Sequence, residues 1–467
     1  MPPSTLPQPP PGGLARQRLH EALDFALRHS AQLTQLQPYW QEPCGNGIEW
    51  LDKVVTETAL LCLIAPRAGG PDPALVAKAQ ALAASIEPLA RKVAYLQKIM
   101  RNPQYVIVYG IAHLALTAAG RPDAYFDFVV RRAVHARLHQ AAERIPFRDL
   151  DAMWLLHGYD EEAFAISFEA VAYGSILSAP TSPFYLTRTD GYAITHTVFY
   201  LTDFGRHPLP AAIDQPRLRQ LLEETIAWNL LAGDLDLLGE LLLCAWQLDQ
   251  QWGPYARLGL DYFFTSWQRL GQLVAPSFEP AHFATLAGPE RAAYQFLHTY
   301  HTYYVGALLC TALCESGFPY ELPIAPGPPA LPGSAGHELQ QLAAEIFAAN
   351  TFLLPVVQAA AVPPADKASC LLDMLLIQAV REYDLRLLAR LYELVPRHGL
   401  PPTSLLRGSL AYLALQQLPD GQCGVFAIGA DTPATRAASA WLATCAAQMQ
   451  AYCASFEPVA DSCMSIA

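Results

Sequence analysis

Residues 215–250 read QPRLRQLLEETIAWNLLAGDLDLLGELLLCAWQLDQ and contain both kinds of helix from which we expect the chain to be built. In residues 215–231, charged and apolar side chains recur with helical spacing, which is typical of a helix with one face in water. After the Gly-Asp pair at 233–234, residues 235–250 are almost entirely apolar, which indicates a helix covered on several sides. The stretch therefore predicts a hairpin of one outer and one inner helix.

The same alternation of two helix types runs along most of the chain. The amphipathic segments are 15–34, 74–100, 123–143, 215–231, 254–271, 336–349, 383–397 and 433–454. The mostly apolar segments are 47–65, 104–119, 190–204, 235–250, 293–316, 367–381 and 404–417, with 147–157 as a shorter eighth candidate. Stacked hairpins either curve into an open superhelix or close into a double ring. Because the segments are unevenly spaced, we expect the closed form: an all-α fold, specifically an α/α toroid of about six to seven hairpins.

Composition agrees with a large buried share. Hydrophobic residues make up 52% of the 467 residues and charged residues 15%, against roughly 25% charged in an average domain. We expect a disordered Pro-rich leader at 1–13, a single toroid domain at 14–467, and a Pro-rich insert at 317–335 within it.

Charge and hydropathy exclude several kinds of partner. The net charge of −12 argues against nucleic acid, and we interpret the most basic stretch, Arg131–Arg144, as a solvated helix face. No apolar run is long enough for a membrane span, so no membrane partner is expected. The N-terminal residues lack the pattern of a secretion signal and there is no CxxC pair, so we expect a cytoplasmic protein.

One ionisable residue interrupts each of five apolar segments. These residues are Glu57, His113, His196, Glu240 and His301. Burial of such a group is costly unless it is paired, hydrogen-bonded or facing a cavity. If the five helices line a ring, these side chains converge on one central site.

The segment THTVFYLTDFG at 195–205 carries the densest set of polar groups. On a helix, His196, Tyr200 and Asp203 share one face, so they could relay a proton, with Asp203 orienting His196. The alternative is that Asp203 ends the helix and His196 is a hydrogen-bonded core residue.

A second candidate pattern is the HxxH of His298 and His301. An i, i+3 pair of histidines can bind a metal, and together with His113 and His196 it would suit zinc or iron. Taken singly, His113 fits the role of a hydrogen-bonded core histidine better than that of a ligand. Glu57 also fits a plain ion pair with Lys53. Glu240 follows Asp234 and Asp236 at the start of its helix, where acids favour the helix dipole.

The string QLPDGQCGVF at 417–426 resembles the Q-x-x-D-G-x-x-G-x-[FW] turn of the terpenoid-cyclase and prenyltransferase toroids. The resemblance implies the architecture alone, because the DxDD acid motif of that class is absent. With TETALL, THTVFYLTDFG, GELLLC and YHTYYV, the chain also resembles a bacterial family of unassigned function found near natural-product gene clusters. The zinc-binding motifs of the lanthionine cyclases are absent, as are the glycine-rich nucleotide motifs, so no nucleotide cofactor is expected.

These observations predict a tailoring enzyme of peptide or secondary-metabolite biosynthesis. Its acid–base or metal site would use His196 and His301 for proton transfer, with Asp203 and Tyr200 beside them and Glu57 and Glu240 as further acids or ligands. The substrate would be a small molecule or a peptide, and partner enzymes of the same biosynthesis are expected. The alternatives are a non-catalytic protein that binds a leader peptide or carrier protein, and a terpene-like cyclase.

Overall fold

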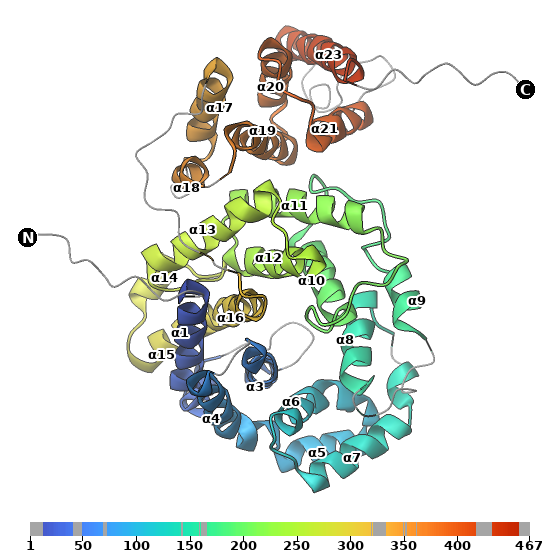
Figure 1. Cartoon of the computed structure of the whole chain (residues 1–467), viewed down its shortest axis with the longest axis vertical. Coiled ribbons are helices and arrows are strands. Elements are labelled where there is room, and N and C mark those ends of the chain that lie inside the picture. The colour runs from blue at the N-terminus through green and yellow to red at the C-terminus, as the bar shows by residue number, and fades with distance from the viewer. Residues whose placement is uncertain are drawn as a thin grey trace, which may run out of the picture.

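The computed structural model describes residues 13–40, 49–68, 72–141, 143–157, 159, 166–318, 320, 333–348, 350, 353–360, 362–416 and 432–456 (Figure 1). Within these ranges the chain is all helical and contains no strand, which confirms the predicted class. The predicted leader, most of the predicted insert and the turn at 417–426 lie outside the described residues.

The longer helices fall into an N-terminal and a C-terminal set. The first set is α1 (Gly13–Ser30), α3 (Trp50–Ile64), α4 (Pro73–Ala90), α5 (Val93–Arg101), α6 (Val106–Ala118), α7 (Ala124–His135), α8 (Pro146–His157), α10 (Arg188–Leu201), α11 (Gln215–Ala232), α12 (Leu235–Asp249), α13 (Pro254–Leu270), α15 (Gly288–Leu297) and α16 (Tyr300–Glu315). The second set is α17 (Gly333–Ile346), α18 (Leu353–Ala359), α19 (Pro364–Arg381), α20 (Leu385–Arg397), α21 (Ser404–Leu415) and α23 (Pro433–Ala454). Short helices are α2 (Leu33–Leu36), α9 (Phe168–Tyr173), α14 (Pro280–Thr285) and the 3₁₀ turns η1 (Gln37–Tyr39), η3 (Ala65–Arg67), η4 (Pro103–Tyr105) and η5 (Leu138–Ala141).

Six helices of the first set contact one another in a closed order. Helix α3 contacts α6, α6 contacts α8, α8 contacts α10, α10 contacts α12, α12 contacts α16, and α16 contacts α3 again. Figure 1 looks onto this group, with α1, α4, α7, α9, α11 and α13 lying outside it. Each of the six corresponds to a segment predicted to be mostly apolar, so the division into inner and outer helices is confirmed for this part of the chain.

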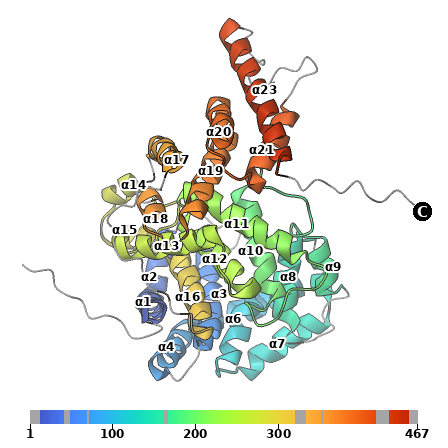
Figure 2. The same ribbon diagram turned by 45° about the horizontal axis from the view of Figure 1, so that its top comes forward.

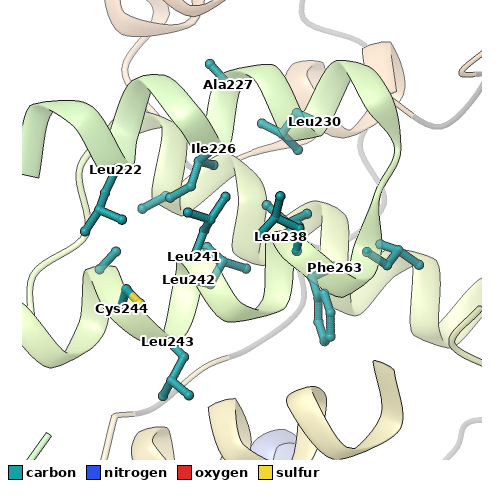
Figure 3. Close-up of a cluster of buried hydrophobic side chains, with 14 of the residues drawn as sticks. Leu222, Ile226, Ala227, Leu230, Leu238, Leu241, Leu242, Leu243, Cys244 and Phe263 are labelled. Carbon is teal, nitrogen blue, oxygen red and sulfur yellow. The ribbon is translucent and has the colours of Figure 1, made fainter. Parts of the chain in front are cut away.

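The hairpin of α11 and α12 shows why the sequence folds in this way. Helix α11 ends at Gly233, whose φ of 65° lies in the left-handed region that favours glycine. Asp234 then caps α12 by accepting hydrogen bonds from the backbone N–H of Asp236 (3.1 Å) and Leu237 (3.2 Å). Leucine and isoleucine side chains of the two helices interdigitate, and Phe263 of α13 packs beside them (Figure 3). Both predicted helices of this hairpin are therefore confirmed.

The C-terminal helices form a second group beside the ring. Helix α19 contacts α11 and α13 on one side and α17, α20 and α21 on the other (Figure 2). Segments 367–381 and 404–417, expected in the inner layer, therefore lie outside it. Their apolar character has a different cause, because α19 is covered by outer helices of the first group and by its own neighbours.

No helix in the described part of the chain is both long and apolar enough to cross a membrane.

Candidate active site

The side chain of His301 lies at the start of α16, among the inner helices, and forms an ion pair with Asp236 of α12. The distance from its Nδ1 to the Oδ1 of Asp236 is 2.7 Å. Burial alone would lower the pKa of His301, but the charges of Asp236 and Glu57 and the hydrogen bond to Asp236 raise it to about 9. The imidazole is therefore protonated at neutral pH.

Asp236 is held as a carboxylate by several donors. Tyr192 of α10 donates to its Oδ2 (2.6 Å), and Thr302 donates to its Oδ1 (3.0 Å). Burial would raise the pKa of Asp236, yet the charge of His301 and these hydrogen bonds outweigh burial and lower it. Because the carboxylate accepts a hydrogen bond from the Nδ1–H of His301, the other ring nitrogen, Nε2, stays available for chemistry.

Two further carboxylates face the Nε2 atom of His301. The Oε1 of Glu57 lies 3.8 Å away and the Oε1 of Glu240 lies 4.0 Å away. Both distances exceed a direct hydrogen bond, so a small polar group placed between them could contact both partners. The site therefore places one acid opposite two carboxylates.

His196 extends the cluster on the other side of Glu240. Its Nε2 lies 3.7 Å from the Oε2 of Glu240, and that oxygen also accepts a hydrogen bond from Thr195 (2.5 Å). The ring of Tyr200 packs against His196, with 6.2 Å between centroids. Burial and the neighbouring charge of Asp151 raise the pKa of Tyr200 well above its usual range, so the phenol stays protonated.

The cluster is open to solvent on one side. The side chains of Glu57, His196 and His301 expose 22%, 23% and 25% of their surface, whereas Glu240 exposes 3%. Lys53 lies 3.5 Å from Glu57, so the ion pair that the sequence offered as the alternative is present as well. Four of the five predicted residues thus meet at one accessible place.

His113 is the predicted residue that lies elsewhere. It is fully buried and packs against Phe126 of α7, with Asp127 at 3.5 Å from its Nε2. Burial and the charge of Arg91 lower the pKa of His113 to about 4 despite Asp127, so the ring is neutral. Its side chain points toward the outer layer, and the prediction that it joins the central site is wrong.

The HxxH prediction fails because the expected helix is broken. Helix α15 ends at Leu297 and α16 begins at Tyr300, so His298 and His301 do not share a helix face. His298 pairs with Ser277 instead (2.8 Å) and stacks on Tyr294. Across the described residues, no group of three or more His, Cys, Asp or Glu side chains is arranged to hold a metal ion.

Asp203 does not orient His196. Helix α10 ends at Leu201, two residues before Asp203, whose φ of 47° starts a left-handed turn. Asp203 accepts a hydrogen bond from the indole of Trp154 (2.9 Å) and pairs with Arg67 (3.4 Å). The alternative interpretation, in which Asp203 belongs to the helix end, agrees with these partners.

Asp236 and Tyr192 are the site residues that the sequence did not reveal. Acidic residues in the first turn of a helix are common because they favour the helix dipole, and this explanation covered both Asp234 and Asp236. Only Asp234 is the cap. Asp236 lies four residues before Glu240 and hence on the same helix face, and that spacing was the available signal.

The model of one protein family matches residues 15–311 of the chain, which is more than half of its length. The chain belongs to the family described as a domain of unknown function, DUF6895. The matched range begins in α1 and ends in α16, so the DUF6895 domain contains the closed group of six helices and every residue of the His301 cluster. Searches of curated proteins and of solved structures found no match.

Proposed function

We propose that this protein is an enzyme that moves protons with His301 as general acid and Glu57 or Glu240 as the opposing base. The observation that carries the proposal is the geometry of His301, whose Nδ1 is held by Asp236 at 2.7 Å while its Nε2 faces two carboxylates at 3.8 and 4.0 Å. An imidazolium that is held on one nitrogen, with the other nitrogen facing two carboxylates across a gap, leaves room for a substrate atom between an acid and a base.

The division of roles follows from protonation. With its pKa raised to about 9, His301 carries the proton that its Nε2 can give to a substrate atom at neutral pH. The carboxyl group of Glu240, oriented by Thr195, can remove a proton from a neighbouring atom of the same substrate. Loss of one proton and gain of another is the balance of an isomerisation, an elimination or a cyclisation.

The toroid remains our interpretation of the ring. It rests on the closed contact order of α3, α6, α8, α10, α12 and α16 and on the match of one family model to this part of the chain alone. A role in tailoring a peptide or other secondary metabolite rests on the resemblance to a family near natural-product gene clusters. The proposed toroid and the proposed biosynthetic role are each independent of the proposed proton transfer by His301.

The test compares wild type with His301→Gln, which keeps the size of the side chain and removes the titratable nitrogen. Each protein is incubated with a metabolite and peptide extract, and mass spectrometry follows compounds that are converted to an isomer or lose water. We expect conversion by wild type and by the matched control His298→Gln, and none by His301→Gln. Equal conversion by His301→Gln would overturn the proposal.

Metal content separates this proposal from the metal alternative. Elemental analysis is made on wild type and on a folded His196→Ala, His301→Ala variant. If wild type contains stoichiometric zinc or iron and the variant does not, the metal alternative is favoured over proton transfer by side chains alone. Wild type that binds a peptide of the extract without changing it would instead favour the non-catalytic binding protein.

A further inference from the structure

The basic residues of this acidic chain are unevenly distributed. Residues 91–148 contain ten Lys and Arg against three Asp and Glu, although the whole chain has 30 against 42. Eight of the ten are arginines, and five of these pair with carboxylates: Arg91, Arg121, Arg131, Arg144 and Arg148. This segment forms α5, η4, α6, α7 and η5 at the rim of the ring.

The same segment exposes large apolar side chains. Each of the following exposes at least 45% of its surface: Val93, Met100, Tyr105, Tyr125, Phe128, Leu138 and Ile145. The inner faces of α5 and α7 are already used, because Tyr95, Ile99, Phe126 and Val130 form a small core of their own. The exposed apolar side chains are therefore not used in packing this core. A patch of exposed apolar side chains of this kind marks an interaction surface.

Apolar and basic groups are interleaved on α7. Tyr125, Phe128, Arg132 and His135 follow one another at spacings of three and four residues, so they form one exposed stripe. The guanidinium of Arg132 lies over the ring of Phe128 at 5.6 Å. The ring of Phe128 thus has a cation beside it.

We propose that α5, α7 and η5 form a surface that binds an anionic lipid bilayer from one side. The exposed Arg101 and Arg132 pair with lipid phosphates, and the aromatic and aliphatic side chains beside them enter the boundary of headgroups and acyl chains. A nucleic acid would satisfy the arginines but would leave Val93, Met100 and Ile145 against water. This assignment departs from the solvated face expected for Arg131–Arg144 and from the expectation that the chain has no membrane partner.

The position of the surface suits a flat partner. Helices α5 and α7 lie at one end of the longest axis of the molecule, and α20 and α23 lie at the other (Figures 1 and 2). A bilayer can therefore touch the basic end without approaching the acidic remainder.

Co-sedimentation with vesicles tests the assignment. Vesicles contain phosphatidylcholine alone or phosphatidylcholine with phosphatidylglycerol at about two to one. We expect the full chain to sediment with the anionic vesicles only, and to be released as ionic strength rises. The variant Arg101→Glu, Arg132→Glu should bind the anionic vesicles about tenfold more weakly or worse. The variant Tyr125→Ser, Phe128→Ser should lose affinity by a similar factor, and this loss should be the same at low and at high salt.

The matched control is Arg386→Glu, Arg390→Glu on α20, which makes the same charge change on exposed residues at the other end of the molecule. This control should bind like wild type, and circular dichroism should show all variants folded. Failure of wild type to bind anionic vesicles, equal binding to neutral vesicles, or an equal loss in the control would each overturn the assignment. Binding of an acidic protein by the same surface without vesicle binding would also overturn it.

Discussion

His301 and His113 interrupt apolar helices in the same way, yet the structure gives them opposite properties. His301 lies among carboxylates at an accessible site and has a pKa raised to about 9. His113 is fully buried against Phe126 of α7, with one carboxylate, Asp127, 3.5 Å from its Nε2, and has a pKa lowered to about 4. The comparison teaches that a polar residue in an apolar helix signals a special environment, while its partners on other helices decide whether that environment is a site or a core.

The largest expected effect comes from Asp236→Asn. An amide cannot balance the imidazolium, so the pKa of His301 should fall by about two units or more, as measured by NMR titration of the ring. Any proton-transfer activity should fall about a hundredfold or more, because at least half of the general acid is neutral at pH 7 and its ring has lost the carboxylate that orients it. A pKa of His301 that stays near 9 in this variant would show that Asp236 is not its main partner.

The next effect is on stability at high pH. Since the pKa of His301 is higher in the folded chain than its ordinary 6.5, its contribution is complete below about pH 6.5 and is lost as the pH rises through about 9. The free energy of unfolding of wild type should fall by about 3 kcal/mol across this window. Urea unfolding measures the change, and His301→Gln should lack this part of the pH dependence.

His113 should give the opposite sign. Its pKa is lower in the folded chain, so the unfolded chain binds more protons between about pH 6.5 and pH 4 and stability falls as the pH falls. The loss should again be about 3 kcal/mol, and His113→Leu should abolish it. At neutral pH the same variant should change the free energy of unfolding by about 1 kcal/mol or less, because the ring is neutral and its partner Asp127 lies as far as 3.5 Å from its Nε2. A larger loss at neutral pH would contradict the core role.

The sequence predicted the features that depend on local patterns and missed those that depend on contacts between distant helices. Alternating helix types are local patterns, so α11 and α12 could be predicted with their boundaries nearly correct. Glu57, His196, Glu240 and His301 were found because each interrupts an apolar face. Their convergence depends on contacts between α3, α10, α12 and α16, which no local pattern contains.

The wrong predictions for His298 and Asp203 have local causes, because a short sequence motif does not show where a helix breaks or ends. The break at 298–299 separates His298 from His301, and the left-handed turn at 203–205 ends α10 before Asp203. Asp236 was missed because the helix dipole already explained an acid at that position. Helix α19 was assigned to the ring because complete burial looks the same in a sequence whichever neighbours supply it.

A smaller effect is expected for Tyr192→Phe. This variant removes one donor to Asp236, at 2.6 Å, and leaves the ion pair with His301 in place. Loss of a hydrogen bond to a charged group should lower the free energy of unfolding by about 2 kcal/mol, and the pKa of His301 should change by less than in Asp236→Asn. If both variants shift that pKa equally, Tyr192 is as important to the charge of His301 as the carboxylate itself.

The smallest effect on the site is expected for Asp203→Asn, although the sequence placed this residue at its centre. Its partners are Trp154 and Arg67, so the substitution should lower the free energy of unfolding by about 1 kcal/mol. The pKa of His301 and the conversion of substrate that depends on it should stay unchanged, because the hydrogen bond and the ion pair of Asp203 go to Trp154 and Arg67 and not to His196 or His301. NMR titration and the conversion assay on the same sample check both halves. A loss of conversion with the fold intact would return Asp203 to the site and would mean that the turn after α10 rearranges when substrate binds.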